Sequence, residues 1–536
     1  MHLRTDTSSN SHFARVPKIT HARNAFTVAK KHVTTIQFDN LYPLYWQYMY
    51  PGDTLSIRKQ VMARLQTQIA TLFDDLYVDM HAWFCPFRLI QTNWSRYQFN
   101  DQPVGPSQDN SSLTSPKITL TGLGAGGFAA KTFYDYLGLP TAVNFSGNTE
   151  HINNYVARAY HEIWNKNYRD QNLQNAVVVD YDDGPDDPAD YATLLKRGKR
   201  HDKFTSALTS QQKGTAVTIP LAGFAPVSWT GTNPGLMRVA ATGVVAGANT
   251  VQTNVSGQIA NTGATIPFIY DPNGSLQANL ALSSAVPVNS LRTSVALQHF
   301  LEADARSGTR DVESINARWG VTVPDYRMNR PEYLGGATFS FDGHVVPQTS
   351  ATSGSNFQAD LAQFSQAESG LNIDHSFVEH GVFLILISCR SNISYQNGID
   401  RDLSMRTRLD WHQPEFSNLG EVAMLNKEIF AIGGNGVQDN QTWGFNEYGY
   451  QLRYQENMVT SEMRSNYAQS LDTYHMADEP SSLPSLGSAW IQSNTPISRN
   501  IAVDTATADP ILLNTLASGR IARTLPMYSV PGLMRL

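Results

Sequence analysis

Histidine, aspartate and glutamate side chains suited to catalysis or metal binding occur at several places, and their spacing limits the chemistry that they can perform. His161 and Glu162 begin like a zinc-protease helix, in which a second histidine must follow the first by four residues. Position 165 is Asn. The zinc motif is therefore incomplete, and these two residues predict no metal-dependent hydrolysis.

Two loop-like segments resemble ligand-binding motifs only superficially. The acidic run "DYDDGPDDPAD", Asp180–Asp190, has its glycine at the fifth position and not the sixth, and no glutamate closes a twelve-residue calcium loop. The glycine-rich "GLGAGG" at 122–127 lacks the lysine that a phosphate-binding loop requires. A solvated acidic turn and a flexible loop are the favoured interpretations, and we predict no catalytic residue, metal site or cofactor.

A pair of glutamates keeps one enzymatic alternative open. Glu421 and Glu428 lie on a predicted helix, and paired carboxylates of this kind serve glycoside hydrolysis. The chain also contains 23 Phe, 9 Trp and 23 Tyr, as carbohydrate-binding β-sandwiches often do. No further residue supports an acid/base pair, so a carbohydrate-binding or carbohydrate-cleaving protein remains the alternative function.

Positive charge is concentrated in two segments that are able to contact phosphate groups without reading sequence. The first has five cations within eight residues and directly follows the acidic run. It either pairs with that run, in the same subunit or a neighbour, or faces DNA. The second is the polar stretch 1–33. The candidate DNA-facing or intersubunit residues are Arg4, Arg15, Lys18, Arg23, Lys196, Arg197, Lys199, Arg200 and Lys203.

Composition narrows the class of protein without naming a function. A formal net charge of -6 over 536 residues argues against a protein devoted to nucleic acid. Cys85 and Cys389 each sit in an apolar run, which predicts buried, reduced thiols. No segment resembles a signal peptide or a membrane span, so we expect no membrane partner and a soluble product made inside the cell.

Hydrophobic periodicity predicts strands at both ends of the chain. In "LYVDMHAWFCPF", Leu76, Val78, Met80, Ala82 and Phe84 alternate with residues of the opposite face. The continuous apolar run in "EHGVFLILISCRSNISYQ" predicts a buried strand. Helical periodicity appears only in the connections, within "HINNYVARAYHEIWNKNY" and "SLRTSVALQHFLEADARSG". This distribution favours a mainly β sandwich with long loop and helical insertions.

One long block nearly lacks charge. The 86 residues from Thr205 to Ser290 contain only three charged side chains, Lys213, Arg238 and Asp271. Val and Thr with frequent Gly and Asn predict short strands and turns. Because interface cores are depleted of charged residues, the block predicts association between copies of the chain.

Several long strings together resemble the major capsid protein of the Microviridae, especially its gokushovirus-like branch. The resemblance extends from about residue 12 to the C-terminal residues and is weakest between Thr205 and Ser290. It is carried by "LEADARSGTRDVESINARWGVTVPDYRMNRPEYLGG", "LGEVAMLNKEIFA", "RSNYAQSLDTYHMA" and "PMYSVPGLMRL", with "HFARVP", "LYPLYWQYMYPGDT" and "LLKRGKRHDKFTS" in matching order.

The resemblance implies a non-enzymatic shell protein with an eight-stranded antiparallel jelly roll. About sixty copies would form a T=1 icosahedral bacteriophage capsid around circular single-stranded DNA. Implied partners are further copies of the chain, a DNA pilot protein and a small internal DNA-binding protein, with the host receptor unidentified. The protein would occur in the virion and, during assembly, in the host bacterial cytoplasm. A trimeric receptor-binding spike is a further alternative.

Four segments follow from these patterns. Residues 1–33 form an extended basic arm, 34–204 the first part of the jelly roll, 205–290 a surface insertion that rises as a threefold protrusion, and 291–536 the second part. The last nine residues contain a Pro and a Gly that oppose a regular helix. We therefore expect an extended intersubunit tail, represented by Tyr528, Pro531 and Leu533.

Overall fold

The computed structural model describes most of the chain. Contacts between residues divide it into two compact units. The larger unit comprises Met1–Gln211 and Ser307–Leu536, and the smaller one comprises Gln212–Arg306. The described residues are 22–99, 101, 112–215, 217, 288–307, 310–347, 349, 354, 361–433 and 436–528, with the backbone of six short strands between Val227 and Ala278.

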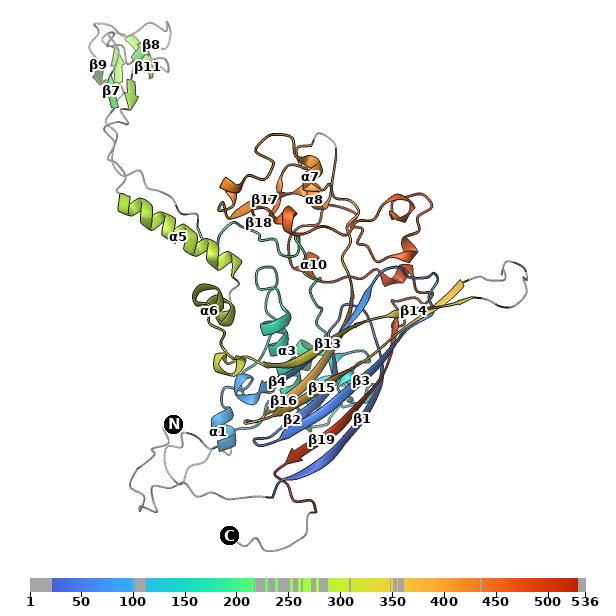
Figure 1. The fold of residues 1–536 in the computed structure, drawn as a ribbon. Helices are drawn as coiled ribbons and strands as arrows, with labels where there is room; N and C mark the ends of the chain where they lie inside the picture. The colour runs from blue at the N-terminus through green and yellow to red at the C-terminus, as the bar shows by residue number, and fades with distance from the viewer. Residues whose placement is uncertain are drawn as a thin grey trace. The chain divides into compact units, whose positions relative to one another are not determined.

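Two antiparallel sheets dominate the larger unit (Figure 1). The five-stranded sheet has the order β1, β19, β3, β15, β14, and the four-stranded sheet has the order β13, β4, β16, β2. The bounds are β1 (Asn24–Ile36), β2 (Tyr42–Met49), β3 (Thr54–Leu65), β4 (Leu76–Pro86), β13 (Glu332–Ser340), β14 (Asp342–Pro347), β15 (Leu361–Ser376), β16 (Gly381–Ser391) and β19 (Ile511–Arg523). The predicted mainly β fold is confirmed as a sandwich.

Shorter elements occupy the connections of the larger unit. Its small sheets pair β5 (Lys117–Thr119) with β6 (His151–Asn153) and β17 (Glu421–Leu425) with β18 (Thr442–Glu447). Its helices are α1 (Trp94–Phe99), α2 (Phe133–Tyr136), α3 (Tyr155–Ile163), α4 (Pro188–Ala192), α6 (Asp311–Trp319), α7 (Arg401–Ser404), α8 (Asn426–Ile429), α9 (Tyr450–Arg453) and α10 (Ser488–Ile491). A π-helix, η4 (Trp164–Tyr168), continues α3.

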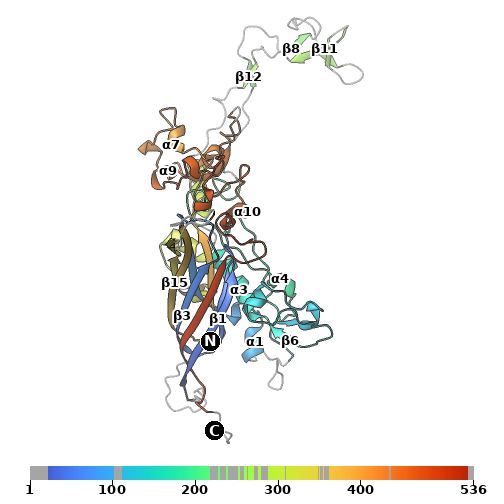
Figure 2. The ribbon, with the colours of Figure 1, turned by 90° about the vertical axis from the view of Figure 1, so that its right-hand side faces the viewer.

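Strand β4 separates two hydrophobic cores because its side chains alternate between them. Leu76, Val78 and Phe84 belong to the core between the sheets, as the alternation predicts. Trp83 and Cys85 point to the other face and join a second core with the residues of α3. Figure 2 shows α3 and α4 on one side of the sandwich, opposite the side on which β15, β3 and β1 lie.

Strand β16 is buried along its whole length, which confirms the interpretation of its apolar run. It pairs with β4 on one side and β2 on the other. Cys389 of β16 and Cys85 of β4 are both buried and free, as predicted, and burial raises the pKa of each thiol well above its usual value.

Strand β1 corrects the expected extent of the N-terminal arm. The strand begins at Asn24 and pairs with β19 along its whole length, so residues 24–33 belong to the sheet. Phe26 and Val28, two residues apart, pack against the main core. This short alternation places the last third of the range 1–33 in a strand and not in an arm.

The smaller unit contains α5 (Val288–Arg306), which confirms the helix predicted from the periodicity near residue 290. It also contains six strands, β7 (Val227–Trp229), β8 (Met237–Val239), β9 (Val251–Thr253), β10 (Ile259–Asn261), β11 (Ala264–Tyr270) and β12 (Leu276–Ala278). This unit starts later than the charge-poor block, because Thr205 and Ala207 are buried in the larger unit.

A lysine lies where the core alternation of β3 calls for an apolar residue. Lys59 falls between Ile57 and Val61 and its side chain is completely buried. Its Nζ donates hydrogen bonds to Thr515 Oγ1 at 2.9 Å and to Leu44 O at 3.5 Å. Burial, with a smaller contribution from Lys30, lowers the pKa of Lys59 to about 8.

We expect Lys59→Met to raise the free energy of unfolding at pH 7 by about 3 kcal/mol, because a pKa lowered on folding opposes folding of the charged form. In the wild type, the unfolded chain binds the Lys59 proton more tightly than the folded chain does. The free energy of unfolding of the wild type therefore rises with pH between about pH 8 and the ordinary lysine pKa of 10.5. The advantage of the variant should shrink over that range. Urea denaturation at pH 7 and pH 10 measures both values, with exposed Lys31→Met as the control. An advantage that is equal at both pH values contradicts the assignment.

Candidate assembly and nucleic-acid surfaces

Three of the predicted basic residues form ion pairs inside the subunit. Arg197 Nη1 lies 3.3 Å from an Asp79 carboxylate oxygen, and Lys199 Nζ lies 2.9 Å from one of Asp478. Lys203 pairs with Glu456, and the Lys203 side chain is almost fully buried. Their partners come from distant parts of the chain, so the expected pairing with the adjacent acidic run is not the one observed.

Cations of this basic cluster also lie over aromatic rings. Arg197 lies over the ring of Tyr168 at 4.9 Å, and Lys199 lies over that of Trp490 at 4.8 Å. Arg200 is half-buried, and its guanidinium lies 4.2 Å from the centre of the Tyr77 ring. Of the five predicted cations in this cluster, Lys196 is exposed, and Arg200 has an aromatic but no carboxylate partner among the described residues.

The acidic run is partly built into the core, which corrects the expectation of a solvated turn. Asp186 is buried and pairs with the fully buried guanidinium of Arg158 on α3. Arg158 Nε donates to Asp186 Oδ2 at 2.8 Å, and Arg158 Nη1 donates to the backbone oxygens of Ile90 and Asp182. The run therefore anchors a loop to α3.

Only some of the residues predicted to make contacts near the two ends of the chain lie within the described ranges. Arg4, Arg15, Lys18, Pro531 and Leu533 lie outside them. Arg23 is exposed, and its guanidinium donates to Thr54 Oγ1. Tyr528 is 80% exposed, and the nearby Leu525 and Met527 are also exposed. Three large apolar side chains thus face solvent just after β19.

The outer face of the five-stranded sheet is a further candidate surface, and the sequence patterns did not predict it. On β1, β19 and β3, the residues that alternate with the core positions are mostly exposed. These outward positions carry four cations and no carboxylate, whereas the neighbouring strand β15 adds Glu368 and Asp374. We call it the open sheet face, and its cations are Lys31, Arg58, Arg64 and Arg520.

Apolar side chains on the open sheet face gather around one asparagine. Leu512 and Leu516 flank Asn514 on β19, while Val33 of β1 and Met62 of β3 pair with Asn514 across the sheet. All four apolar side chains are at least 40% exposed. An exposed apolar group with surrounding cations is typical of a surface that contacts a partner.

Comparison with known proteins identifies the family. The model of the capsid protein (F protein) family of phages matches residues 14–533. The chain belongs to this phage capsid protein family. Capsid protein VP1 of Bdellovibrio phage phiMH2K is 38% identical over 505 residues, covering 92% of each chain. Capsid protein VP1 of Chlamydia phage 1 is 32% identical over 98% of each chain, and that of Spiroplasma virus 4 is 28% identical over 96% of each.

The resemblance to the Microviridae major capsid protein is thereby confirmed, and the chain is a phage major capsid protein and a virion component. Such a protein acts by associating with copies of itself. The exposed side chains on the open sheet face and after β19 are therefore candidates for intersubunit or genome contacts.

Family membership indicates a structural role, and the side chains once considered for catalysis have structural partners in this capsid protein. His161 Nδ1 lies 2.8 Å from Val178 O, and Glu162 accepts a hydrogen bond from Tyr181. Within the described ranges, no three His, Cys, Asp or Glu residues cluster as metal ligands. Nor is any helix in those ranges both long and apolar enough to cross a membrane.

The two glutamates considered for glycoside hydrolysis lie on different elements. Glu421 begins strand β17, so the helix predicted for it is wrong, whereas Glu428 lies on α8. Glu428 is fully buried and accepts hydrogen bonds from Tyr450 Oη at 2.6 Å, Arg401 Nη1 at 3.3 Å and the Leu425 backbone at 2.9 Å. Its carboxylate thus ties α7, α8 and α9 together.

Proposed function

We propose that this capsid protein forms a T=1 icosahedral shell of about sixty copies around a circular single-stranded DNA genome. The observation that carries the proposal is the strand order of the sandwich, considered together with the family match. No catalytic step and no cofactor is part of this function.

The strand order supports an eight-stranded jelly roll. Taken in chain order, β1, β2, β3, β4, β13, β15, β16 and β19 count as strands one to eight. One sheet then has the order one, eight, three, six, and the other has five, four, seven, two. Successive strands alternate between the two sheets except for strands four and five, which pair within one sheet, and this is the double Greek-key pattern of jelly rolls in viral capsids. In this proposal β14 is an added edge strand beside β15.

The open sheet face is our proposed surface toward the genome. Lys31, Arg58, Arg64 and Arg520 provide positive charge without carboxylates on the same three strands. Contacts between such side chains and phosphates need no particular base sequence, which suits the packaging of a whole genome. Exposed Lys196 and Arg23 are further candidates, while the paired Arg197, Lys199 and Lys203 support the subunit itself.

The charge-poor block 205–290, which lies within the connection between β4 and β13, is our proposed protrusion at the threefold axes. Its near absence of charge favours contact between copies, and the contacts of Gln212–Arg306 separate it from the sandwich unit. Other proposed partners are a DNA pilot protein, a small internal DNA-binding protein and a host surface receptor. Assembly would take place in the bacterial cytoplasm.

Electron cryomicroscopy of the full chain, expressed in bacteria that also produce circular single-stranded DNA, tests this proposal. We expect closed particles with icosahedral symmetry and sixty subunits, with nucleic-acid density against the open sheet face. A soluble trimer, as a spike would form, or a small oligomer that hydrolyses glycans contradicts the shell. Particles with the open sheet face turned outward contradict the genome-facing assignment alone.

A further inference from the structure

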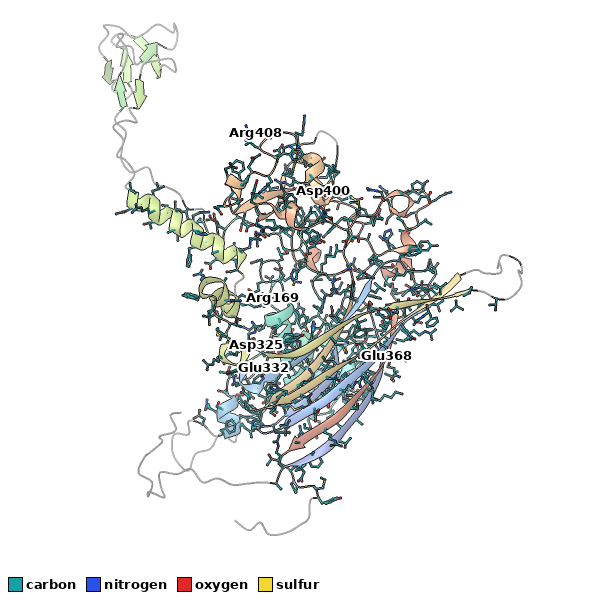
Figure 3. The ribbon with its side chains drawn as sticks, in the orientation of Figure 1. Arg169, Asp325, Glu332, Glu368, Asp400 and Arg408 are labelled. Carbon is teal, nitrogen blue, oxygen red and sulfur yellow. The ribbon has the colours of Figure 1, made fainter. Side chains whose placement is uncertain are left out.

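An arginine-rich pocket of about 420 Å³ lies beyond the end of η4. Its lining comes from five separate places: the end of η4 with the residues after it, the basic segment near residue 200, the start of α6 with the residue before it, the last part of β16, and the end of α10. Arg169, which follows η4, is labelled in Figure 3. The cations of the lining are Arg169, Arg197, Lys199, Arg200, Arg310 and Arg390.

Carboxylates neutralise only part of this charge. Asp79 is shared by Arg390, at 2.6 Å, and by Arg197, at 3.3 Å. Arg310 pairs with Glu313 at 2.8 Å, and Lys199 has Asp478 as described above. Asp170, which also lines the pocket, uses its Oδ1 to accept backbone N–H groups of Asn172 and Leu173. Six cations thus face four carboxylates.

Two of the arginines form no salt bridge with a carboxylate among the described residues. Arg169 donates from Nη1 to Gln174 O, and the guanidinium of Arg200 lies against the Tyr77 ring. Buried atoms without a hydrogen-bond acceptor include Arg169 Nε, Arg200 Nη1 and Arg310 Nε. Because buried donors are nearly always paired in folded proteins, orphaned donors from three separate segments indicate a missing acceptor.

Repulsion between the cations points to the same conclusion. Burial and then the charge of Arg310 lower the pKa of Arg169, and the charge of Asp170 offsets only part of this shift. Burial, followed by the charge of Arg390, lowers the pKa of Arg197 to about 10. A bound anion would offset both the repulsion and the unpaired donors.

We propose that this pocket binds a phosphate group through Arg169, Arg200 and Arg310. A phosphate offers several acceptor oxygens and more than one negative charge at neutral pH, which suits guanidinium groups that approach from different segments. The pocket volume lies in the range of small-molecule sites, so the phosphate is able to carry a larger substituent. Two sources share this chemistry, free phosphate and the phosphodiester of a nucleic acid. The inference does not depend on the geometry of the shell.

Calorimetric titration of the full-length protein with inorganic phosphate, at an ionic strength held constant with chloride, tests the proposal. We expect saturable binding and a rise in melting temperature that chloride does not produce. Arg169→Gln and Arg200→Gln should each weaken phosphate binding by about 10- to 100-fold, as expected for a lost charge-assisted hydrogen bond. Arg408→Gln is the control, since Arg408 is exposed and lies apart from Arg169 (Figure 3).

A second measurement separates loss of binding from loss of folding. Without phosphate, Arg200→Gln should melt no lower than the wild type, because it removes an unpaired cation from a repulsive cluster. Arg200→Lys should retain part of the phosphate affinity. If both arginine variants bind phosphate as tightly as the control, the assignment is wrong.

Competition with a short single-stranded oligonucleotide identifies the source of the phosphate. Displacement of bound phosphate by the oligonucleotide, lost in the same arginine variants, supports a nucleic-acid phosphate. Binding of inorganic phosphate alone supports a free-anion site. If neither binds and the variants instead fail to form particles, the pocket receives an acidic side chain of a neighbouring subunit and the phosphate proposal is overturned.

Discussion

Asp186→Asn is expected to lower the free energy of unfolding of the larger unit by about 3 to 5 kcal/mol, the usual cost of breaking a buried ion pair. Asp186 accepts hydrogen bonds from Arg158 and, at 2.6 Å, from Asn154 Nδ2. Asparagine removes the charge and turns an amide N–H toward donors. The Arg158 guanidinium, which has no exposed surface, would then lack its buried counter-charge.

Urea denaturation followed by tryptophan fluorescence measures this effect. Asp190→Asn is a matched control, because Asp190 belongs to the same acidic run but is exposed. We expect the control to change stability by no more than about 0.5 kcal/mol. Equal stability of the two variants would mean that the acidic run acts only through its total charge.

The importance of Asp186 was not predictable from the acidic run itself. Periodicity predicts α3 correctly, with Tyr155, Val156 and Ala159 in its apolar stripe. Arg158 falls between these positions in the sequence, where an exposed side chain is the ordinary expectation. Burial of this arginine follows from the loop that folds over α3, and no local pattern specifies that loop.

Strands were predictable where the sequence alternates clearly between apolar and other residues, as in β4, or contains a long apolar run, as in β16. Residues 24–33 of strand β1 were assigned to the arm because Phe26 and Val28 are surrounded by small, polar and basic residues. Its partner, β19, lies near the opposite end of the chain. Such non-local pairing leaves no local signal in either segment, and it is this pairing that forms the open sheet face.

The same limitation applies to the basic cluster around residue 200. The density of positive charge in the sequence identified the cluster, but it does not specify which carboxylates pair with its cations. Asp79 and Asp478, which pair with Arg197 and Lys199, are separated from them by 118 and 279 residues. The fold thus pairs these two candidate DNA-facing or intersubunit cations inside the subunit, whereas Arg200, which lines the same pocket, forms no salt bridge among the described residues.

Removal of Tyr528–Leu536 is expected to abolish particle formation while leaving a folded subunit. Tyr528, the described residue of this segment, exposes 80% of its surface just beyond the end of β19. Large exposed aromatic side chains frequently provide the main binding energy of an interface. In a closed shell the same contact recurs in every subunit, so its loss acts on all of them.

The truncated subunit should fold because the end of β19 is held by residues that remain. Arg523 Nε lies 3.0 Å from an Asp53 carboxylate oxygen, and Arg523 Nη2 donates to Tyr48 O. Asn24 Nδ2 donates to Leu525 O at 2.8 Å. Circular dichroism and thermal denaturation should therefore match those of the full chain, whereas size-exclusion chromatography and electron microscopy should show no particles.

A chain with the same nine residues in scrambled order separates sequence from length. If the tail occupies a specific site on a neighbouring subunit, the scrambled chain should fail to assemble in the same way as the truncated one. If the scrambled tail restores particles, only its length or composition matters. Normal particles from the truncated chain contradict an assembly role for the tail, and an unfolded truncated chain would show instead that these residues complete the sandwich.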